Sequence, residues 1–183
     1  MCIRDRPVAD LLAPALGPDD HVDGPADAPL ELVMYGDFQC PYCSAAQGIL
    51  RRVRDRLEGR LRFAFRHFPI PEVHPDAERA AEASEAAAAQ GAFWPMHDAL
   101  YALGGRLGLD DVVTAAARAG VPNAERVRDE VERGVWAERV ARDKASGEAS
   151  GVQGTPTFFI NGERHAGAFD AQSLIAALEG RAA

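Results

Sequence analysis

The sequence predicts a mixed α/β fold in which a helical block is inserted between two groups of strands. Three observations support this: a strand–helix–strand pattern over residues 30–67, a series of helical segments over residues 75–150, and two short strands before a final helix over residues 157–180. At 183 residues, the chain is long enough for one domain with an insertion. The strand–helix–strand unit is expected to have a right-handed connection.

Residues 1–29 are predicted to be a linker or a non-native N-terminal segment. They are rich in proline, aspartate, glycine and alanine, and they end in the breaker-rich run DGPADAPL. No basic start followed by an unbroken apolar core is present, so no signal peptide is predicted. The sequence as given therefore predicts a cytoplasmic protein, and an extracytoplasmic location is expected only if the N-terminus is truncated.

Folded structure is predicted to begin near Leu30 with a short buried strand, LELVMY. From Pro41 to about Leu57, apolar residues recur at helical spacing, which predicts a helix. The next segment, RLRFAFRHFP, alternates apolar and basic residues, as expected of a strand.

The segments that follow carry clear helix and turn signals. In the helical block, DDVVTAAARAG has an aspartate as the predicted N-cap and a closing glycine. After the block, TFFI and ERHAG are predicted strands, joined by Asn161-Gly162, a dipeptide that favours a type I′ hairpin turn. Asp170 is predicted to cap the last helix.

The overall charge argues against some classes of partner. The formal net charge is −8, and the acidic residues are interspersed with arginines. Because nucleic-acid binding needs a clustered basic surface, no nucleic-acid partner is expected. No apolar run approaches the ~20 residues that span a bilayer. We therefore expect no direct membrane insertion by this chain, and we expect a monomer.

Two cysteines, Cys40 and Cys43, lie where the first predicted strand ends and the first helix begins. A helix N-terminus favours a thiolate, so the pKa of Cys40 is expected to fall below the free value of ~8.5. Cys43 lies one turn further in and is expected to be more buried. This arrangement predicts an exposed Cys40 that attacks a disulfide and a Cys43 that resolves the mixed disulfide. Pro41 suits the first helical position.

A metal site and two idle thiols are the alternatives for this pair. One CxxC motif can be half of a zinc site, but no second CxxC or closely spaced histidine pair completes it, so no metal is expected. The five histidines are scattered singly: His21, His67, His74, His97 and His165. A second clue favours redox chemistry. Thr155-Pro156 precedes an apolar strand, and a cis-proline there would leave the backbone of Thr155 free to pair with an extended peptide.

Taken together, these motifs resemble the DsbA-like branch of the thioredoxin superfamily. The similar motifs are DFQCPYC, FRHFPI, FWPMHDALY and GVQGTPTFFING, and the resemblance covers about residues 28–180. It implies a thioredoxin-like fold with a core over residues 30–74 and 151–180 and an inserted helical subdomain over residues 75–150.

The resemblance also implies an activity and roles for particular residues. Cys40 would be the nucleophile, Cys43 the resolving cysteine and Pro156 the cis-proline, while the backbone of Thr155 would dock the substrate. The expected activity is disulfide exchange with protein cysteines. No bound cofactor is expected, and an unknown redox partner would recycle the protein.

Two positions depart from the family pattern. The dipeptide between the cysteines is Pro41-Tyr42, and the most oxidising members have a histidine at the position of Tyr42. A less oxidising disulfide is therefore expected. Met34 stands where the family often places a glutamate that moves the resolving cysteine's proton. Asp37 and Asp143 are possible substitutes, although surface or capping roles suit both better.

The motif FWPMHDALY has two interpretations. Most simply, its apolar residues pack the helical block onto the first helix. The alternative is an apolar substrate groove that uses Trp94 and Phe38, so Phe38 is a candidate substrate-binding residue. His67, His74 and His97 are interpreted as capping or packing residues.

Two other functions remain open at this point. The first is a thioredoxin-like redox-sensing or docking module associated with a membrane transporter, because similar domains occur fused to sodium/proton antiporters. The second is a DsbA-like isomerase or glutathione-dependent transferase. It is less favoured, because those proteins usually have serine where Cys40 stands.

Overall fold

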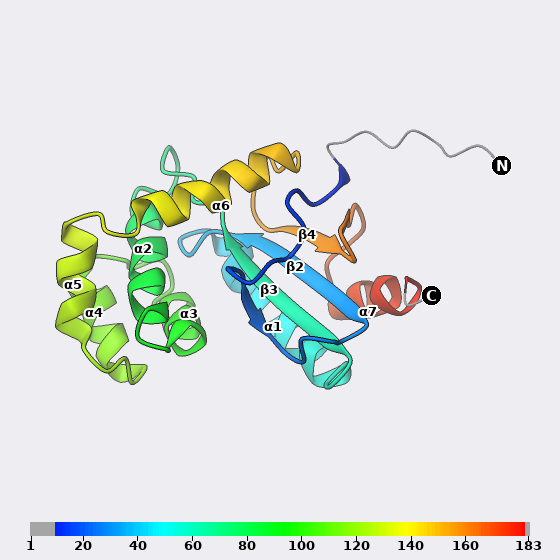
Figure 1. Ribbon diagram of the computed structural model, residues 1–183, viewed down its shortest axis with the longest axis horizontal. Helices are drawn as coiled ribbons and strands as arrows, with labels where there is room; N and C mark the ends of the chain where they lie inside the picture. Colours follow the sequence, from blue (N-terminus) through cyan, green and yellow to red (C-terminus); the bar gives the residue numbers. More distant parts are fainter. Residues whose placement is uncertain (1–9, 182–183) are drawn as a thin grey trace.

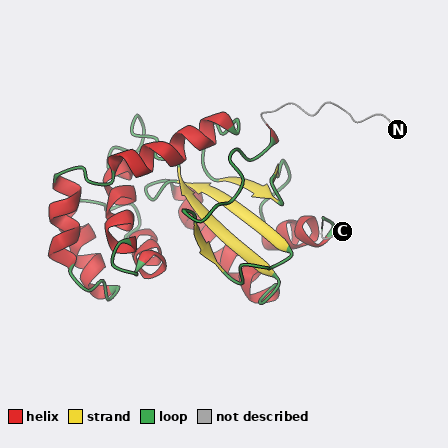
Figure 2. Ribbon diagram, viewed as in Figure 1, coloured by secondary structure: helices red, strands yellow, loops and turns green. Residues whose placement is uncertain are grey.

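The structure, a computed structural model, describes residues 10–181. The first nine residues of the predicted linker, including Cys2, lie outside the described residues. The described part contains five strands and seven α-helices (Figures 1 and 2). The strands are β1 (His21–Asp23), β2 (Leu30–Gly36), β3 (Leu61–His67), β4 (Thr157–Ile160) and β5 (Glu163–Arg164). The helices are α1 (Pro41–Arg56), α2 (Ala77–Ala88), α3 (Phe93–Ala102), α4 (Leu109–Arg118), α5 (Ala124–Glu132), α6 (Ala137–Ala149) and α7 (Ala171–Glu179).

One five-stranded sheet, in the order β1-β3-β2-β4-β5, forms the centre of the fold. β2 and β3 are parallel, with Met34 opposite Phe65, and the other strand pairs are antiparallel. Both faces of the sheet are covered, because alternate residues of β2 belong to two separate hydrophobic clusters. Leu32 and Met34 pack with α1 and α7, whereas Val33 and Tyr35 face the opposite cluster. The predicted mixed α/β architecture, with a helical block between two groups of strands, is confirmed.

The prediction that folded structure begins near Leu30 is wrong. β1 pairs with β3 as an antiparallel edge strand, with His21 opposite Phe65. Further upstream, Leu11 forms a β-bridge with Glu163, and Leu12 is buried in the second hydrophobic cluster. Residues 10–29 therefore cover an edge and a face of the sheet whose backbone and apolar groups would otherwise meet water.

This N-terminal segment also explains an unexpected burial in β3. Arg66 belongs to the apolar–basic alternation of the sequence, yet it is only 2% exposed. Its guanidinium forms a two-pronged ion pair with Asp20, at 2.7 and 2.9 Å, and donates to the hydroxyl of Tyr35 at 3.1 Å. A buried arginine needs such partners, and the segment before β1 supplies them.

The helical block, α2 to α6, lies beside the sheet (Figure 1). α2 is its central helix and contacts α3, α5 and α6, while α6 leads back toward the sheet and contacts β3. In α4, Gly108 is the N-cap, which corrects the predicted aspartate cap. Asp110 and Asp111 lie instead in the first turn, where their charges favour the positive end of the helix dipole.

The C-terminal part confirms most of the local predictions. Asn161 and Gly162 both have positive φ, at 48° and 79°, as a type I′ turn requires. β5 is shorter than predicted and ends at Arg164. The side chain of Asp170 accepts a hydrogen bond from the backbone N–H of Ser173 and so caps α7. Among residues 10–181, no helix combines the length and apolar character needed to cross a membrane.

Candidate active site

The two cysteines of the CxxC motif lie at the start of α1. Cys40 is the N-cap, with extended backbone angles, and Pro41 is the first helical residue. Cys43 is fully buried in the first turn, as expected. Cys40, however, is only 3% exposed, so the prediction of an exposed thiol is wrong. The reason is tertiary: the loop before β4 packs against it, with Cys40 Sγ 3.4 Å from the carbonyl oxygen of Thr155.

The surroundings of Cys40 stabilise its thiolate. The largest effect is a hydrogen bond from the Cys43 thiol, and the backbone N–H groups of Tyr42 and Cys43 add to it. Together with the nearby side chain of Thr155, they outweigh the effect of burial and lower the pKa of Cys40 to about 5. No acidic residue lies in the first turn of α1 to oppose this. Cys40 is therefore a thiolate at neutral pH, the reactive form of the side chain.

Cys43 has the opposite electrostatic character. Burial raises the pKa of Cys43 far above its ordinary value, and the neighbouring Cys40 sulfur raises it further. Cys43 therefore keeps its proton and donates a hydrogen bond to the Cys40 thiolate. The Cys40 sulfur is thus ionised, whereas the Cys43 sulfur stays protonated as long as Cys40 carries its negative charge.

The loop before β4 completes the site on the side opposite α1. The peptide bond between Thr155 and Pro156 is cis, and both residues are partly exposed. On the α1 side, Tyr42 is 67% exposed. The accessible surface around the thiols thus includes Tyr42 and the Thr155-Pro156 loop.

Asp37 fixes the short loop between β2 and α1. Its carboxylate is buried and accepts four hydrogen bonds. Oδ1 accepts from the backbone N–H groups of Gln39 and Cys40, at 2.7 and 3.2 Å. Oδ2 accepts from the backbone N–H of Ile70 at 3.0 Å and pairs with His74 Nδ1 at 2.8 Å. The interpretation of Asp37 as a surface carboxylate is wrong; it positions the backbone that carries Cys40.

Tyr101 belongs to the motif FWPMHDALY, which most simply predicts packing, yet its hydroxyl lies at the site. Its hydroxyl donates to the carbonyl oxygen of Asp37 at 3.4 Å, and the hydroxyl is close enough to Cys43 for the two groups to affect each other's ionisation. Burial is the main reason that the pKa of Tyr101 is raised, so the hydroxyl stays protonated. The sequence pattern that could have indicated this position is helical spacing. Phe93, His97 and Tyr101 recur every four residues and so share one face of α3.

Phe38 does not line a substrate groove. It is 2% exposed and packs against Phe65 and Tyr101, with ring centroids 5.3 and 5.0 Å apart. Trp94 packs in the same way against Phe63 and Phe93. The candidate substrate role of Phe38 is therefore corrected to packing of the hydrophobic core.

A proton relay for the resolving cysteine would need a carboxylate in place of Met34. Met34 is fully buried in the cluster that contains Cys43. Glu31, the acidic residue of β2, pairs with Arg62 at 2.6 Å. Asp143 is buried rather than on the surface, and it accepts from the backbone N–H of His67 at 3.0 Å while pairing with Arg139. Of the carboxylates considered, Asp37 is the one hydrogen-bonded to the cysteine motif.

Comparisons with known proteins identify the family and the fold of this chain. The sequence model of the thioredoxin family matches residues 17–180. "Na(+)/H(+) antiporter NhaA 1" of Salinispora arenicola is 43% identical over 171 residues, which are 93% of this chain and 26% of that protein. This chain thus spans about a quarter of the length of that relative.

Two solved structures have the same fold. A thioredoxin-like oxidoreductase from Silicibacter pomeroyi has a TM-score of 0.76 at 25% identity, covering 90% of this chain and 92% of that one. Wolbachia pipientis alpha-DsbA1 has a TM-score of 0.76 at 20% identity, covering 91% of this chain and 94% of that one.

Proposed function

Because the chain belongs to the thioredoxin family and has its DsbA-like fold, we propose that it is a thiol–disulfide oxidoreductase that acts on protein cysteines. The active site of this proposal is Cys40-Pro41-Tyr42-Cys43. One observation carries it: Cys40 is held as a thiolate with a pKa of about 5, beside a protonated Cys43. Two idle thiols would have no need of this difference.

The proposed reaction balances without a cofactor. The Cys40 thiolate attacks one sulfur of a substrate disulfide, which forms a mixed disulfide and releases the other sulfur as a thiolate. Cys43 then gives up its proton to solvent and attacks the Cys40 sulfur, which releases the second substrate thiolate. Two electrons pass to the substrate, and Cys40 and Cys43 form a disulfide. The reverse sequence oxidises a substrate dithiol, and a separate redox protein restores the starting form.

Substrate would bind along the loop before β4. The Thr155 carbonyl oxygen lies 3.4 Å from the Cys40 sulfur, so an extended substrate segment that paired with the backbone of this loop would bring its own sulfur close to Cys40. In this proposal, residues 30–74 and 151–180 form the redox core, and residues 75–150 form an inserted helical subdomain. The subdomain contributes Tyr101 next to Cys43.

Reduction of insulin and oxidation of a reduced peptide test the proposal. Cys40→Ser should abolish both activities, because it removes the attacking thiolate. Cys2→Ser is the matched control, since it makes the same change outside the described residues, and it should retain full activity. Full activity of Cys40→Ser would refute the proposal.

A second candidate is a redox-sensing or docking module of a membrane transporter. The identity to about a quarter of a sodium/proton antiporter favours it. Sequencing the genomic DNA on both sides of this coding region would test it. Membrane-spanning helices in the same reading frame would support the module, whereas stop codons on both sides would refute a fusion.

A further inference from the structure

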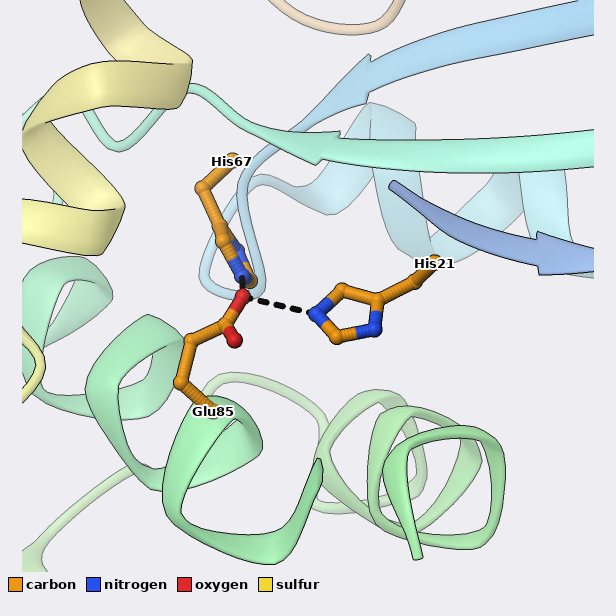
Figure 3. A group of neighbouring side chains, drawn as sticks. All are labelled: His21, His67 and Glu85. Carbon is orange, nitrogen blue, oxygen red and sulfur yellow. Dashed lines mark hydrogen bonds and ion pairs between the residues drawn. The ribbon is translucent and has the colours of Figure 1, made fainter. Parts of the chain in front are cut away.

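Three side chains of types that can bind a metal ion converge, and none of them belongs to the cysteine motif. His21 comes from β1, His67 from the end of β3 and Glu85 from α2 (Figure 3). Nε2 of each histidine lies 2.8 Å from the same oxygen, Oε1 of Glu85. The ligand atoms of all three residues lie within 4.8 Å of one another. Histidines that look scattered in the sequence are therefore brought together by the fold.

The charged groups around this cluster carry more negative than positive charge, which favours a bound cation. Glu85 and Asp143 are both buried carboxylates, and Arg139 approaches both of them. It forms a close ion pair with Asp143, while its Nη2 is 3.8 Å from Glu85 Oε1. One guanidinium thus serves two carboxylates, and the remaining negative charge faces the two imidazole rings. A proton on a histidine or a bound metal ion would balance it.

The rings are held in place before any ligand binds. His21 stacks on Phe93, with centroids 3.6 Å apart and an interplanar angle of 9°. His67 is packed edge-on against Phe65 and Phe93. Such fixed donors lose little conformational freedom on binding. His67 and Glu85 are buried, but the His21 side chain is 17% exposed, so the cluster opens to solvent at the edge strand.

The donor set selects the class of metal. Two imidazole nitrogens and one carboxylate oxygen suit Zn²⁺ and related transition ions, whereas Ca²⁺ and Mg²⁺ prefer oxygen ligands alone. We propose that His21, His67 and Glu85 form a transition-metal site that binds Zn²⁺. The bound ion would join β1 and β3 of the sheet to the helical block. Water would supply the fourth ligand at the open side near His21.

The second nitrogen of His67 limits the affinity of this site. Nδ1 of His67 is buried, and it has no hydrogen-bond partner among the described residues. A metal-binding histidine usually donates this N–H to an acceptor, and loss of such a partner weakens metal binding ~10–100-fold. The proposed site therefore binds Zn²⁺ reversibly and can be emptied by a chelator.

The test must exclude the thiols, which also bind zinc. We would use untagged protein carrying Cys2→Ser, Cys40→Ser and Cys43→Ser, treated with a chelator and then dialysed. Calorimetric titration with Zn²⁺ should show one site per chain, and bound Co²⁺ should give the visible absorption of a four-coordinate ion. Mg²⁺ and Ca²⁺ should give no such binding. Absence of Zn²⁺ binding to this folded protein would refute the site.

Single substitutions in the same background locate the binding. His21→Ala changes the most exposed ligand and should weaken Zn²⁺ binding at least ~10-fold, as should Glu85→Gln. His165→Ala is the matched control and should bind normally. If Glu85→Gln fails to fold, His21→Ala alone decides the outcome, with folding checked by circular dichroism. Unchanged affinity in a folded His21→Ala protein would refute the proposal, and loss of thiol activity would not bear on it.

Discussion

Replacing Cys43 with alanine should raise the pKa of Cys40, because the Cys43 thiol is the largest contributor to the stability of that thiolate. With a pKa of about 5, Cys40 is about 99% ionised at pH 7. At the ordinary value of 9.0 it would be only about 1% ionised. The structure thus predicts a large difference in reactivity at neutral pH.

The size of the effect of Cys43→Ala follows from the interaction that is lost. A hydrogen bond to a charged group contributes about 1.5–3 kcal/mol, which corresponds to about 1–2 pKa units. The backbone N–H groups of residues 42 and 43 remain in the variant, and so does Thr155. The pKa of Cys40 should therefore rise from about 5 to about 6–7 and stay below 9.0.

The ultraviolet absorbance of the thiolate and the rate of alkylation by iodoacetamide, both followed against pH, measure this value. The Cys2→Ser background keeps the third thiol out of the signal. A midpoint near 9 in the unaltered CxxC site would refute the electrostatic reasoning. So would a Cys43→Ala variant whose midpoint stays the same or falls.

The same shift makes the stability of the reduced protein depend on pH. The pKa of Cys40 is lower in the folded chain than in the unfolded chain, so the unfolded chain binds more protons between about pH 5 and 9. The contribution of Cys40 to the free energy of unfolding is therefore complete above pH 9 and is lost as the pH falls through about 5. Urea unfolding of the reduced protein across this range should show it, and Cys40→Ser should remove that part of the pH dependence.

Three further predictions follow from the site. The pKa of Cys40 is about 5, against ~7 for the reactive cysteine of thioredoxin, which should stabilise the reduced form by about 50 mV. A glutathione redox titration should therefore give a reduction potential of about −220 mV. A value of about −120 mV would contradict the reasoning. Asp37→Asn should lower the free energy of unfolding by about 3 kcal/mol in urea titrations, because the NH2 group that replaces one carboxylate oxygen cannot accept from the Ile70 N–H or from His74. The exposed control Asp129→Asn should change it by less than about 1 kcal/mol. Tyr101→Phe should slow resolution of the mixed disulfide about 2–10-fold in quenched-flow trapping, because it removes the hydroxyl beside Cys43, and an unchanged rate would assign Tyr101 to packing alone.

Local sequence determined the parts of the fold that depend on neighbouring residues. The CxxC motif at the start of α1, the Asn161-Gly162 turn and the Asp170 cap were all predictable. Each depends on backbone geometry within a few positions, so the residues that specify it lie next to one another in the chain. From β2 onward, the order of the strands and helices followed from the spacing of apolar residues, whereas β1 was not predicted.

Burial at the site was decided by contacts between distant segments. Cys40 was expected to be exposed, but the loop before β4, over 100 positions later, covers it. Phe38 was expected to bind substrate, but the aromatic face of α3 encloses it. Asp37 gained two of its four partners, Ile70 and His74, from the loop after β3. A short motif cannot reveal which side chains will lie above it.

The sequence by itself therefore determined where the two cysteines lie, at the start of a helix that follows a buried strand. The tertiary structure alone decided the electrostatics that tune those cysteines and the meeting of His21, His67 and Glu85. The physical reason is that pKa values and ligand sets depend on distances of a few ångströms between groups far apart in the chain. Those distances exist only once the helical block and the N-terminal segment have packed onto the sheet.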